Sequence, residues 1–145
     1  MSILVNNVGI LPNGRIDELN LSTAVHSSNI NINAQTYMSL YMLKRKRREF
    51  SSQSAIITLS SKAAHDIRGF MPLYCATKRY NLALSQALAH AHPNFDILAV
   101  TPASVATQMN KGDRPYTVSA SACAKSTIDQ LGWTRETWGS PWHAF

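Results

Sequence analysis

The stretch Ala55-Ile56-Ile57-Thr58-Leu59, followed at once by Ser60-Ser61, says most about the fold. Its residues are apolar or β-branched and do not alternate with charged ones, which is the pattern of a strand buried on both faces of a parallel sheet. Two similar apolar segments, Ile3–Val5 and Ile97–Val100, lie on either side of it in the sequence. The sequence therefore predicts three short strands of one parallel sheet.

A helical segment is expected between each pair of these strands. Apolar residues in 28–48 can form one stripe, and apolar residues in 73–92 recur at helical spacing until Pro93 ends the segment. The order strand, helix, strand, helix, strand predicts right-handed crossovers and an α/β fold with three layers, helix, sheet and helix. Shorter helices are expected near residues 20–27 and 120–131.

The composition is that of one folded domain: of the 145 residues, 45% are hydrophobic and 15% are charged. No apolar run approaches the roughly 18–20 residues that cross a bilayer, and the first residues do not resemble a signal peptide. Cys75 and Cys123 do not make a disulfide framework, so we expect reduced thiols and a compartment that faces the cytosol. His90 and His92 are too few ligands to indicate a metal site, and none is expected.

Positive charge is concentrated in one run, Lys44 to Arg48, in a chain whose formal net charge is +6. The simplest interpretation is a solvated helix end, where cations face the negative pole of the helix dipole. A nuclear signal, a nucleic-acid patch and a contact with anionic lipid are the sharper alternatives. The run has no interleaved aromatic residues, so nucleic-acid binding is the least favoured of the functions considered below.

Tyr74 and Lys78 form the most chemically suggestive pair. They stand four residues apart in the second helical segment and therefore share a helix face. A nearby ammonium favours the phenolate and lowers the pKa of a tyrosine from its usual value near ~10. Ser61 lies thirteen residues before Tyr74 at the carboxyl end of a strand, where open α/β sheets bind ligands. A surface pair and a strand-end cap are the ordinary alternatives for these residues.

Three further positions are candidates for the same site. Asn6 and Gly9 follow the first strand, where an asparagine can tie loops together and a glycine allows the backbone to approach a ligand closely. Asn33 lies inside the first long helix, and asparagine is a poor helix former unless its side chain has a partner there. For Asn33, a solvent-facing side chain is the ordinary alternative.

Taken in order, these motifs resemble those of the short-chain dehydrogenase/reductase family, and the resemblance covers nearly the whole chain. The matching elements are Asn6-Asn7-Val8-Gly9, Ile32-Asn33-Ala34, Ser60-Ser61, Tyr74-x-x-x-Lys78 and Pro102-Ala103-Ser104-Val105-Ala106-Thr107. The later segments are similar to very-long-chain 3-oxoacyl-CoA reductases and the related 17-beta-hydroxysteroid dehydrogenases. These segments include Arg114-Pro115, Leu131-Gly132 and Trp142-His143-Ala144-Phe145.

The resemblance implies a role for each matching residue. Tyr74 would protonate the substrate carbonyl oxygen, Lys78 would hold the nicotinamide ribose and shift the pKa of Tyr74, and Ser61 would polarise the carbonyl. Asn33 would hold a water that links Lys78 to solvent. The positions implied to contact the cofactor are Asn6, Gly9, Tyr74, Lys78, Pro102, Val105 and Thr107.

The resemblance also implies a segment that this sequence does not show. In the family, the Gly-rich loop that binds pyrophosphate, and the residue that selects NAD or NADP, lie upstream of the first strand found here. At ~30 residues per βαβ unit, we expect roughly 80 or more residues of that half to be missing. Residues 1–145 are therefore expected to form a single partial dinucleotide-binding domain, the C-terminal part of a Rossmann-like doubly wound sheet. Pro102-Ala103 also departs from the usual Pro-Gly.

Three functions follow from these observations. The first is an oxidoreductase for 3-oxoacyl-CoA or steroid-like ketones in lipid metabolism or fatty acid elongation, using NADP(H) rather than NAD(H). The resemblance places such an enzyme on the cytosolic face of the endoplasmic reticulum membrane and allows a homo-oligomer. The second is an inactive fragment that retains the catalytic residues but does not bind cofactor. The third is a nucleic-acid binder that uses the basic run.

Overall fold

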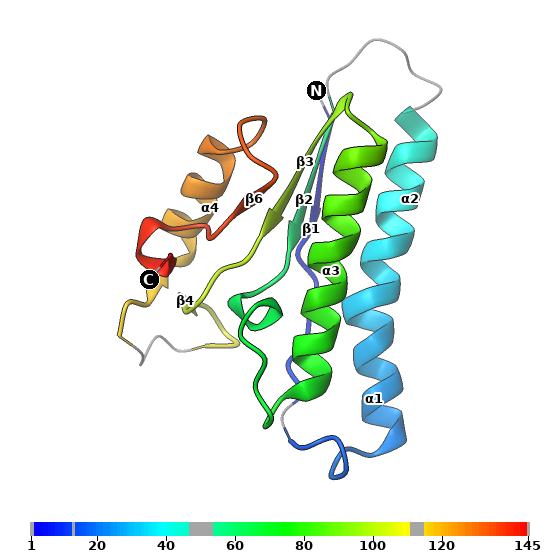
Figure 1. Ribbon diagram of the computed structural model, residues 1–145, viewed down its shortest axis with the longest axis vertical. Helices are drawn as coiled ribbons and strands as arrows, with labels where there is room; N and C mark the ends of the chain where they lie inside the picture. The colour runs from blue at the N-terminus through cyan, green and yellow to red at the C-terminus, as the bar shows by residue number, and fades with distance from the viewer. Residues whose placement is uncertain (1, 13, 47–53, 111–114, 145) are drawn as a thin grey trace.

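The computed structural model describes residues 2–12, 14–46, 54–110 and 115–144 (Figure 1). Within these residues the main sheet has the order β1 (Ser2–Asn6), β2 (Ser54–Leu59), β3 (Phe95–Val100) and β6 (Glu136–Thr137). All three pairings are parallel, and Ile57 of β2 lies between Val5 of β1 and Leu98 of β3. The three strands expected from the apolar segments are therefore confirmed.

The short strands were not foreseen. β6 extends the sheet beyond β3, and β4 (Val105–Ala106) pairs in parallel with β5 (Val118–Ser119) in a second, two-stranded sheet. Each of these strands has two residues, so a sequence pattern has too few positions to indicate it. They exist because tertiary contacts bring loop segments alongside partners.

The helices lie close to the expected segments. They are α1 (Leu21–Ser28), α2 (Ala34–Lys46), α3 (Pro72–Ala91) and α4 (Ala120–Asp129), with single-turn elements η1 (Asn29–Asn33), η2 (Lys62–Ala64) and η3 (Pro141–His143). Asn20 begins α1 by accepting a hydrogen bond from the backbone N–H of Thr23, and Ser119 begins α4 in the same way. Pro72 suits the first turn of α3 because that position needs no N–H donor. A π-helical turn, η1, joins α1 to α2.

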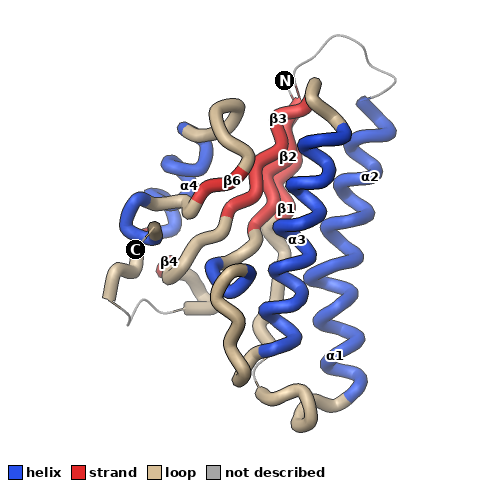
Figure 2. The backbone as a smooth tube through the Cα atoms, viewed as in Figure 1, coloured by secondary structure: helices blue, strands red, loops and turns tan. Residues whose placement is uncertain are grey.

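The sheet has different coverings on its two faces (Figures 1 and 2). α2 and α3 lie side by side against one face, where Ile56, Ala89 and Ile97 form a buried cluster. α4 and the C-terminal residues lie on the other side, where Ile57, Leu98 and Val100 pack with Leu131. Burial of an aliphatic side chain of this size stabilises the fold by about 1.5–3 kcal/mol. These two clusters attach the helices to the two faces of the sheet, which makes three layers.

The second face is less covered at β1. In the described part of the chain β1 is at one edge of the sheet, and Ile3 and Val5 are 44% and 53% exposed. Leu4, which points to the opposite face, packs against the cluster beneath α2 and α3. The α/β fold with a parallel sheet is confirmed, and the three layers are complete over β3 rather than over β1.

The structure bears on two further features of the sequence, its apolar helices and its basic run. No helix among the described residues is long and apolar enough to cross a membrane. Lys44 and Arg45 are exposed near the end of α2, while Arg47 and Arg48 of the basic run lie outside the described residues.

Candidate active site

A cavity of about 1140 Å³ opens where β1, β2 and β3 end. This is the edge at which open parallel sheets bind ligands, because the loops after the strands meet there. The cavity brings together most of the residues expected from the sequence. Those that line it are Gly9, Ser61, Tyr74, Lys78, Pro102, Val105 and Thr107.

Lys78 is the most deeply placed charged group of the cavity. It is only 5% exposed, and its Nζ donates a hydrogen bond to the carbonyl of Leu59 at 2.8 Å. Nζ also lies 5.7 Å from the centroid of the Tyr74 ring, one turn away on α3. Burial lowers the pKa of Lys78 to about 8, because removal from water disfavours the ammonium.

The pKa of Tyr74 is raised, mainly by burial of the phenol and slightly by Cys75, while a hydrogen bond with Ser61 acts to lower it. From the sequence we expected Lys78 to lower this pKa. In the structure the contribution that lowers this pKa comes from the hydrogen bond with Ser61. Tyr74 is therefore a protonated donor at neutral pH.

Ser61 and Ser60 have separate tasks. Ser61 begins the single turn η2, where its Oγ accepts a hydrogen bond from the Ala63 N–H at 3.2 Å. Ser60 is buried and donates to the carbonyl of Lys78 at 2.7 Å. Ser60 thus fastens the end of β2 to α3, so that Ser61 and Tyr74 lie together.

The position expected for the water-holding asparagine needs correction. Asn33 lies on the outer side of η1 and donates to the Oδ1 of Asn29 at 2.8 Å, so the structure does not bring it to the cavity. Asn31 lies closer to it, beside Gly9, and is fully buried. Its side chain bonds both the N–H and the C=O of Ile10, each at 2.9 Å, and donates to Thr77 Oγ1 at 3.2 Å.

The π-helical turn η1 holds both asparagines and gives their side chains different partners. Asn29, Asn31 and Asn33 alternate in the sequence, and an ideal helix would not direct them as η1 does. A π turn inserts an extra residue and rotates the following side chains, and such turns are frequent at functional sites. Only the burial of Asn31 distinguishes it from its neighbours.

Gly9 lies against Lys78 and Asn31. A methyl group on its Cα would be 3.4 Å from the Nζ of Lys78 and 3.5 Å from the Oδ1 of Asn31. The glycine therefore allows the backbone after β1 to approach these two polar groups closely.

Asn6 does not line the cavity as expected. It is 4% exposed, and its Nδ2 donates to the Oγ of Ser39 at 2.9 Å, which ties the end of β1 to α2. Asn7 lines the cavity in its place. Successive side chains of a strand point to opposite faces, so the two asparagines cannot share one task.

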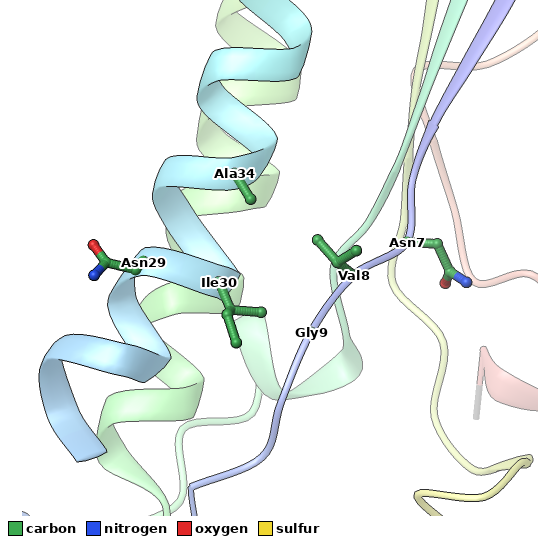
Figure 3. Close-up of a pocket in the computed structure, with 6 residues that line it drawn as sticks. All are labelled: Asn7, Val8, Gly9, Asn29, Ile30 and Ala34. Carbon is green, nitrogen blue, oxygen red and sulfur yellow. The ribbon is translucent and has the colours of Figure 1, made fainter. Parts of the chain in front are cut away.

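A second cavity of about 600 Å³ lies beside the first, between the chain after β1 and the start of α2. Figure 3 shows Val8 opposite Ile30 and Ala34, whereas the amide of Asn7 points away from the helix. Gly9 lines both cavities. The two cavities therefore adjoin each other along the chain that follows β1.

The loop after β3 forms the far wall of the site. Pro102 accepts a hydrogen bond from the Lys62 N–H at 2.9 Å, which joins this loop to η2. Val105 belongs to β4 and is half-buried, and Thr107 is exposed. Trp142, from the C-terminal residues, also lines the cavity.

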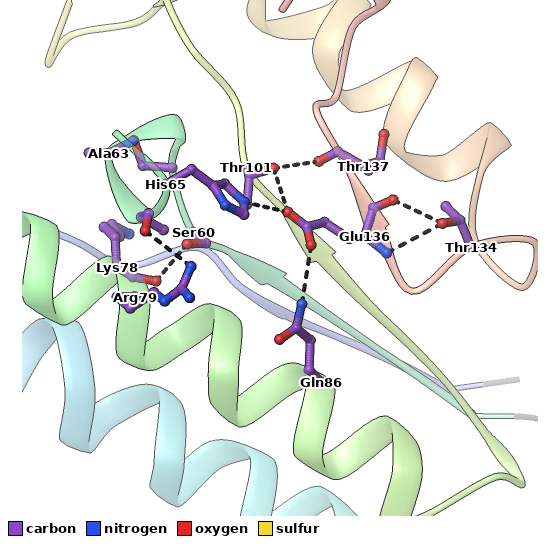
Figure 4. A network of polar contacts seen from close by, with 12 residues as sticks. Ser60, Ala63, His65, Lys78, Arg79, Gln86, Thr101, Thr134, Glu136 and Thr137 are labelled. Atoms are coloured by element: carbon purple, nitrogen blue, oxygen red, sulfur yellow. Dashed lines mark hydrogen bonds and ion pairs between the residues drawn. The ribbon is translucent and has the colours of Figure 1, made fainter. Parts of the chain in front are cut away.

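A polar network connects the serine loop with β6 (Figure 4). Glu136 Oε1 accepts hydrogen bonds from His65 Nε2 at 2.6 Å and Thr101 Oγ1 at 3.3 Å. The other carboxylate oxygen accepts from Gln86 at 3.2 Å. The contact between His65 and Glu136 spans 71 residues, so no local sequence pattern indicates it.

The described residues contain no group of three or more His, Cys, Asp or Glu side chains that could hold a metal ion. The Nδ1 of His90 lies 3.2 Å from the Nη1 of Arg135, a cationic side chain that does not ligate metals.

Residues 1–117 match the family model described as short chain dehydrogenase. The chain is 33% identical over 114 residues to 17-beta-hydroxysteroid dehydrogenase type 3 of Mus musculus. That alignment covers 77% of this chain and 37% of the mouse protein.

Solved structures show the same fold. A 3-ketoacyl-(acyl-carrier-protein) reductase from Brucella melitensis, complexed with NADH, has a TM-score of 0.80 at 17% identity, covering 90% of this chain and 60% of that one. A short-chain dehydrogenase from Sphingobium yanoikuyae, in complex with NADPH, has a TM-score of 0.79 at 22% identity, covering 88% and 52%. The chain thus spans little more than half of these solved chains.

Proposed function

The chain belongs to the short chain dehydrogenase family, and from this premise we propose that it transfers hydride between a nicotinamide cofactor and a ketone or the corresponding alcohol. The observation that carries the proposal is the meeting of Ser61, Tyr74 and Lys78 on one cavity at the ends of the strands. Asn31 and Gly9 complete the arrangement behind Lys78.

Each side chain has a chemical task that suits its surroundings. Tyr74, whose raised pKa keeps the phenol protonated, donates its proton to the carbonyl oxygen of the ketone. Ser61, which bonds Tyr74, donates a second hydrogen bond to the same oxygen as negative charge develops. Lys78, with a pKa lowered to about 8, is poised to return a proton toward Tyr74 near neutral pH.

The nicotinamide cofactor supplies the hydride when it is bound. Residues present here fit that group: Lys78 lines the cavity beside the backbone of Gly9, and its ammonium is a donor that suits a ribose hydroxyl. Pro102, Val105 and Thr107 line the opposite wall. Asn31, rather than Asn33, takes the proposed role of linking Lys78 to solvent, because Asn31 alone of the two is at the site.

For the substrate we propose a bulky, largely apolar ketone of the 3-oxoacyl or steroid type. The support is the size of the cavity, about 1140 Å³, and its apolar wall of Leu11, Met71, Met109, Ile128 and Trp142. NADP(H) as the preferred cofactor, and a place on the cytosolic face of the endoplasmic reticulum in lipid metabolism, rest on the resemblance to 3-oxoacyl-CoA reductases. A homo-oligomer rests on the same resemblance.

The experiment is a cofactor titration followed by an activity assay on the purified chain. Tryptophan fluorescence would report binding of NADPH and NADH, and nicotinamide absorbance would report turnover with a 3-oxoacyl-CoA and with a steroid ketone. The proposal expects saturable binding and turnover, and Tyr74→Phe is expected to bind cofactor without turning over. Turnover that persists in Tyr74→Phe would contradict the mechanism.

The second candidate is a chain that retains the catalytic side chains but does not bind cofactor by itself. The observation in its favour is the edge position of β1 with Ile3 and Val5 exposed, which suits another strand and further packing. It predicts a folded chain with no saturable cofactor binding in the same titration, and restored binding when a complementary chain from the same family covers β1.

A further inference from the structure

The C-terminal residues contact both loops that border the cavity. Glu136 in β6 holds the loop after Ser61, and His143 in η3 holds the loop after β3. The match to the short chain dehydrogenase model ends at residue 117, so it assigns no task to this segment. We propose that residues 136–143, here named the C-terminal clamp, position the two loops for the reaction, an inference that rests on the proposed function.

His143 connects η3 to the loop after β3. Its ring is 1% exposed, although it lies on the wall of the cavity. The Ala103 N–H donates to Nδ1 at 3.3 Å, and Nε2 lies 3.1 Å from the carbonyl of Ser104. One imidazole therefore contacts the backbone of two successive residues, between Pro102 and Val105.

The neutral Nε2–H tautomer satisfies this geometry. In that form Nε2–H donates to the Ser104 carbonyl and Nδ1 accepts from Ala103. The Nδ1–H form would instead donate to the Trp138 carbonyl at 3.1 Å and would lose both bonds to the loop. The doubly protonated form would leave the Ala103 N–H without this acceptor and would place a charge in a buried site.

Glu136 connects β6 to the loop that follows Ser61. Its carboxylate accepts a 2.6 Å bond from His65 Nε2, which follows directly after η2 (Figure 4). Gln86 of α3 and Thr101 at the end of β3 bond the same carboxylate, so its orientation is set from two sides. The His65 ring also lies 5.3 Å from the ring of Trp138. β6 is thus connected to the loop that begins at Ser61.

The two loops are also joined to each other. The Lys62 N–H donates to the Pro102 carbonyl at 2.9 Å, so a shift of either loop moves the other. Ser61 and Pro102 stand at the beginning of these loops, and both line the cavity. The C-terminal clamp therefore fixes the distance between the hydroxyl that meets the substrate and the wall that meets the cofactor.

The first test needs no enzymatic activity. Long-range nitrogen–proton NMR on the complete 145-residue chain identifies the tautomer of each histidine ring, and we expect the Nε2–H tautomer for His143. In His143→Ala, amide exchange of Ala103 should rise by about tenfold, since its acceptor is lost. The Thr101 amide, which donates to Thr137 O at 2.8 Å, should keep its rate.

Variants then separate positioning from general stability. His143→Gln retains one donor and one acceptor, and it is expected to restore slow exchange at Ala103. His65→Ala should speed exchange of the Lys62 amide, which reports the junction of the two loops. His26→Ala, an exposed histidine on α1, is the matched control and should change neither amide.

Kinetics connect the clamp to catalysis. His143→Ala should lower kcat by about tenfold with a much smaller change in KM, and His143→Gln should recover most of that loss. If the unaltered chain shows no turnover, the proposed function fails, while the NMR measurements still decide the clamp. An Nδ1–H tautomer, or an Ala103 amide whose exchange is the same in His143→Ala and in the unaltered chain, would overturn the clamp whatever the activity. Should His143→Ala not fold, the tautomer of the unaltered chain and the exchange rates of His143→Gln decide it.

Discussion

The ammonium nitrogen of Lys78 lies 5.7 Å from the centroid of the Tyr74 ring while it donates its hydrogen bond to the carbonyl of Leu59. Both groups are driven toward their neutral forms, since burial lowers the pKa of Lys78 to about 8 and raises that of Tyr74. A proton held by Lys78 is therefore easily released near the phenol that the reaction uses. The pair has consequences for stability as well as for catalysis.

Stability should rise with pH on the alkaline side because of Lys78. The unfolded chain keeps the lysine proton until its ordinary pKa of 10.5, whereas the folded chain loses it at about 8. Unfolding between these values takes up a proton, so the free energy of unfolding should increase by roughly 2 kcal/mol from about pH 8 to 10. Urea unfolding across this range in the unaltered chain and in Lys78→Met measures it, and the variant should give a flatter profile.

Lys44→Met is the matched control for this pH profile, because Lys44 is an exposed lysine on α2. Its slope with pH should equal that of the unaltered chain. An equal slope in Lys78→Met would show that the buried ammonium does not titrate in this window.

Asn31 and Asn33 should differ sharply in their effect on stability. Asn31→Ala leaves the partly buried N–H and C=O of Ile10 without these partners, so we expect a loss of roughly 1–3 kcal/mol in the free energy of unfolding. Asn33→Ala removes one exposed hydrogen bond and should change it by less than about 0.5 kcal/mol. Urea unfolding of the two variants decides between them, and equal losses would contradict the assignment of Asn31.

Ser61 and Ser60 should separate catalysis from packing. Ser61→Ala removes a hydrogen-bond donor at the carbonyl oxygen and is expected to lower kcat by about 10²–10³-fold with little loss of stability. Ser60→Ala leaves the Lys78 carbonyl without its 2.7 Å bond and should lower stability by about 1–3 kcal/mol. Steady-state kinetics and thermal melts of both variants measure this. A Ser60→Ala variant with the larger loss of kcat would reverse the assignment.

Gly139 should tolerate no side chain. Its φ is +66°, a conformation that favours glycine, and an added methyl group would lie 2.7 Å from the Sγ of the buried Cys123. Gly139→Ala should therefore lower the free energy of unfolding by about 2–4 kcal/mol. Gly69→Ala, where no heavy atom lies within 4 Å of the added methyl, is the matched control and should change little.

A second substitution separates the two causes at Gly139. Cys123→Ala removes the sulfur that the new methyl group would meet, so the double variant should recover the packing part of the loss. The cost of the left-handed backbone, about 1 kcal/mol, should remain. A double-mutant cycle with no coupling would mean that the contact with Cys123 is not the cause.

The main strands and helices could be predicted from the sequence, because their patterns depend on residues that are near neighbours in the chain. Ala55 to Leu59 are all apolar or β-branched and form a strand buried on both faces, and residues 72–91 form α3 within a residue of the expected bounds. β6 escaped prediction because Glu136 and Thr137 have no apolar pattern and pair only through contact with β3. The spacing of Ser61, Tyr74 and Lys78 in the sequence likewise indicated a shared site, and all three line one cavity in the structure.

The sequence by itself determined the parallel α/β arrangement and the family, because strands, helices and motifs of this kind are read from short segments. Only the tertiary structure decided which asparagine lies beside Gly9. The π-helical turn buries Asn31, whereas Asn33 bonds Asn29, and the end of β1 directs Asn6 to Ser39. It also decided that Glu136 and His143 hold the cavity loops. These contacts join residues 71 and 40 positions apart, and hydrogen bonds over such separations exist only once the chain has packed.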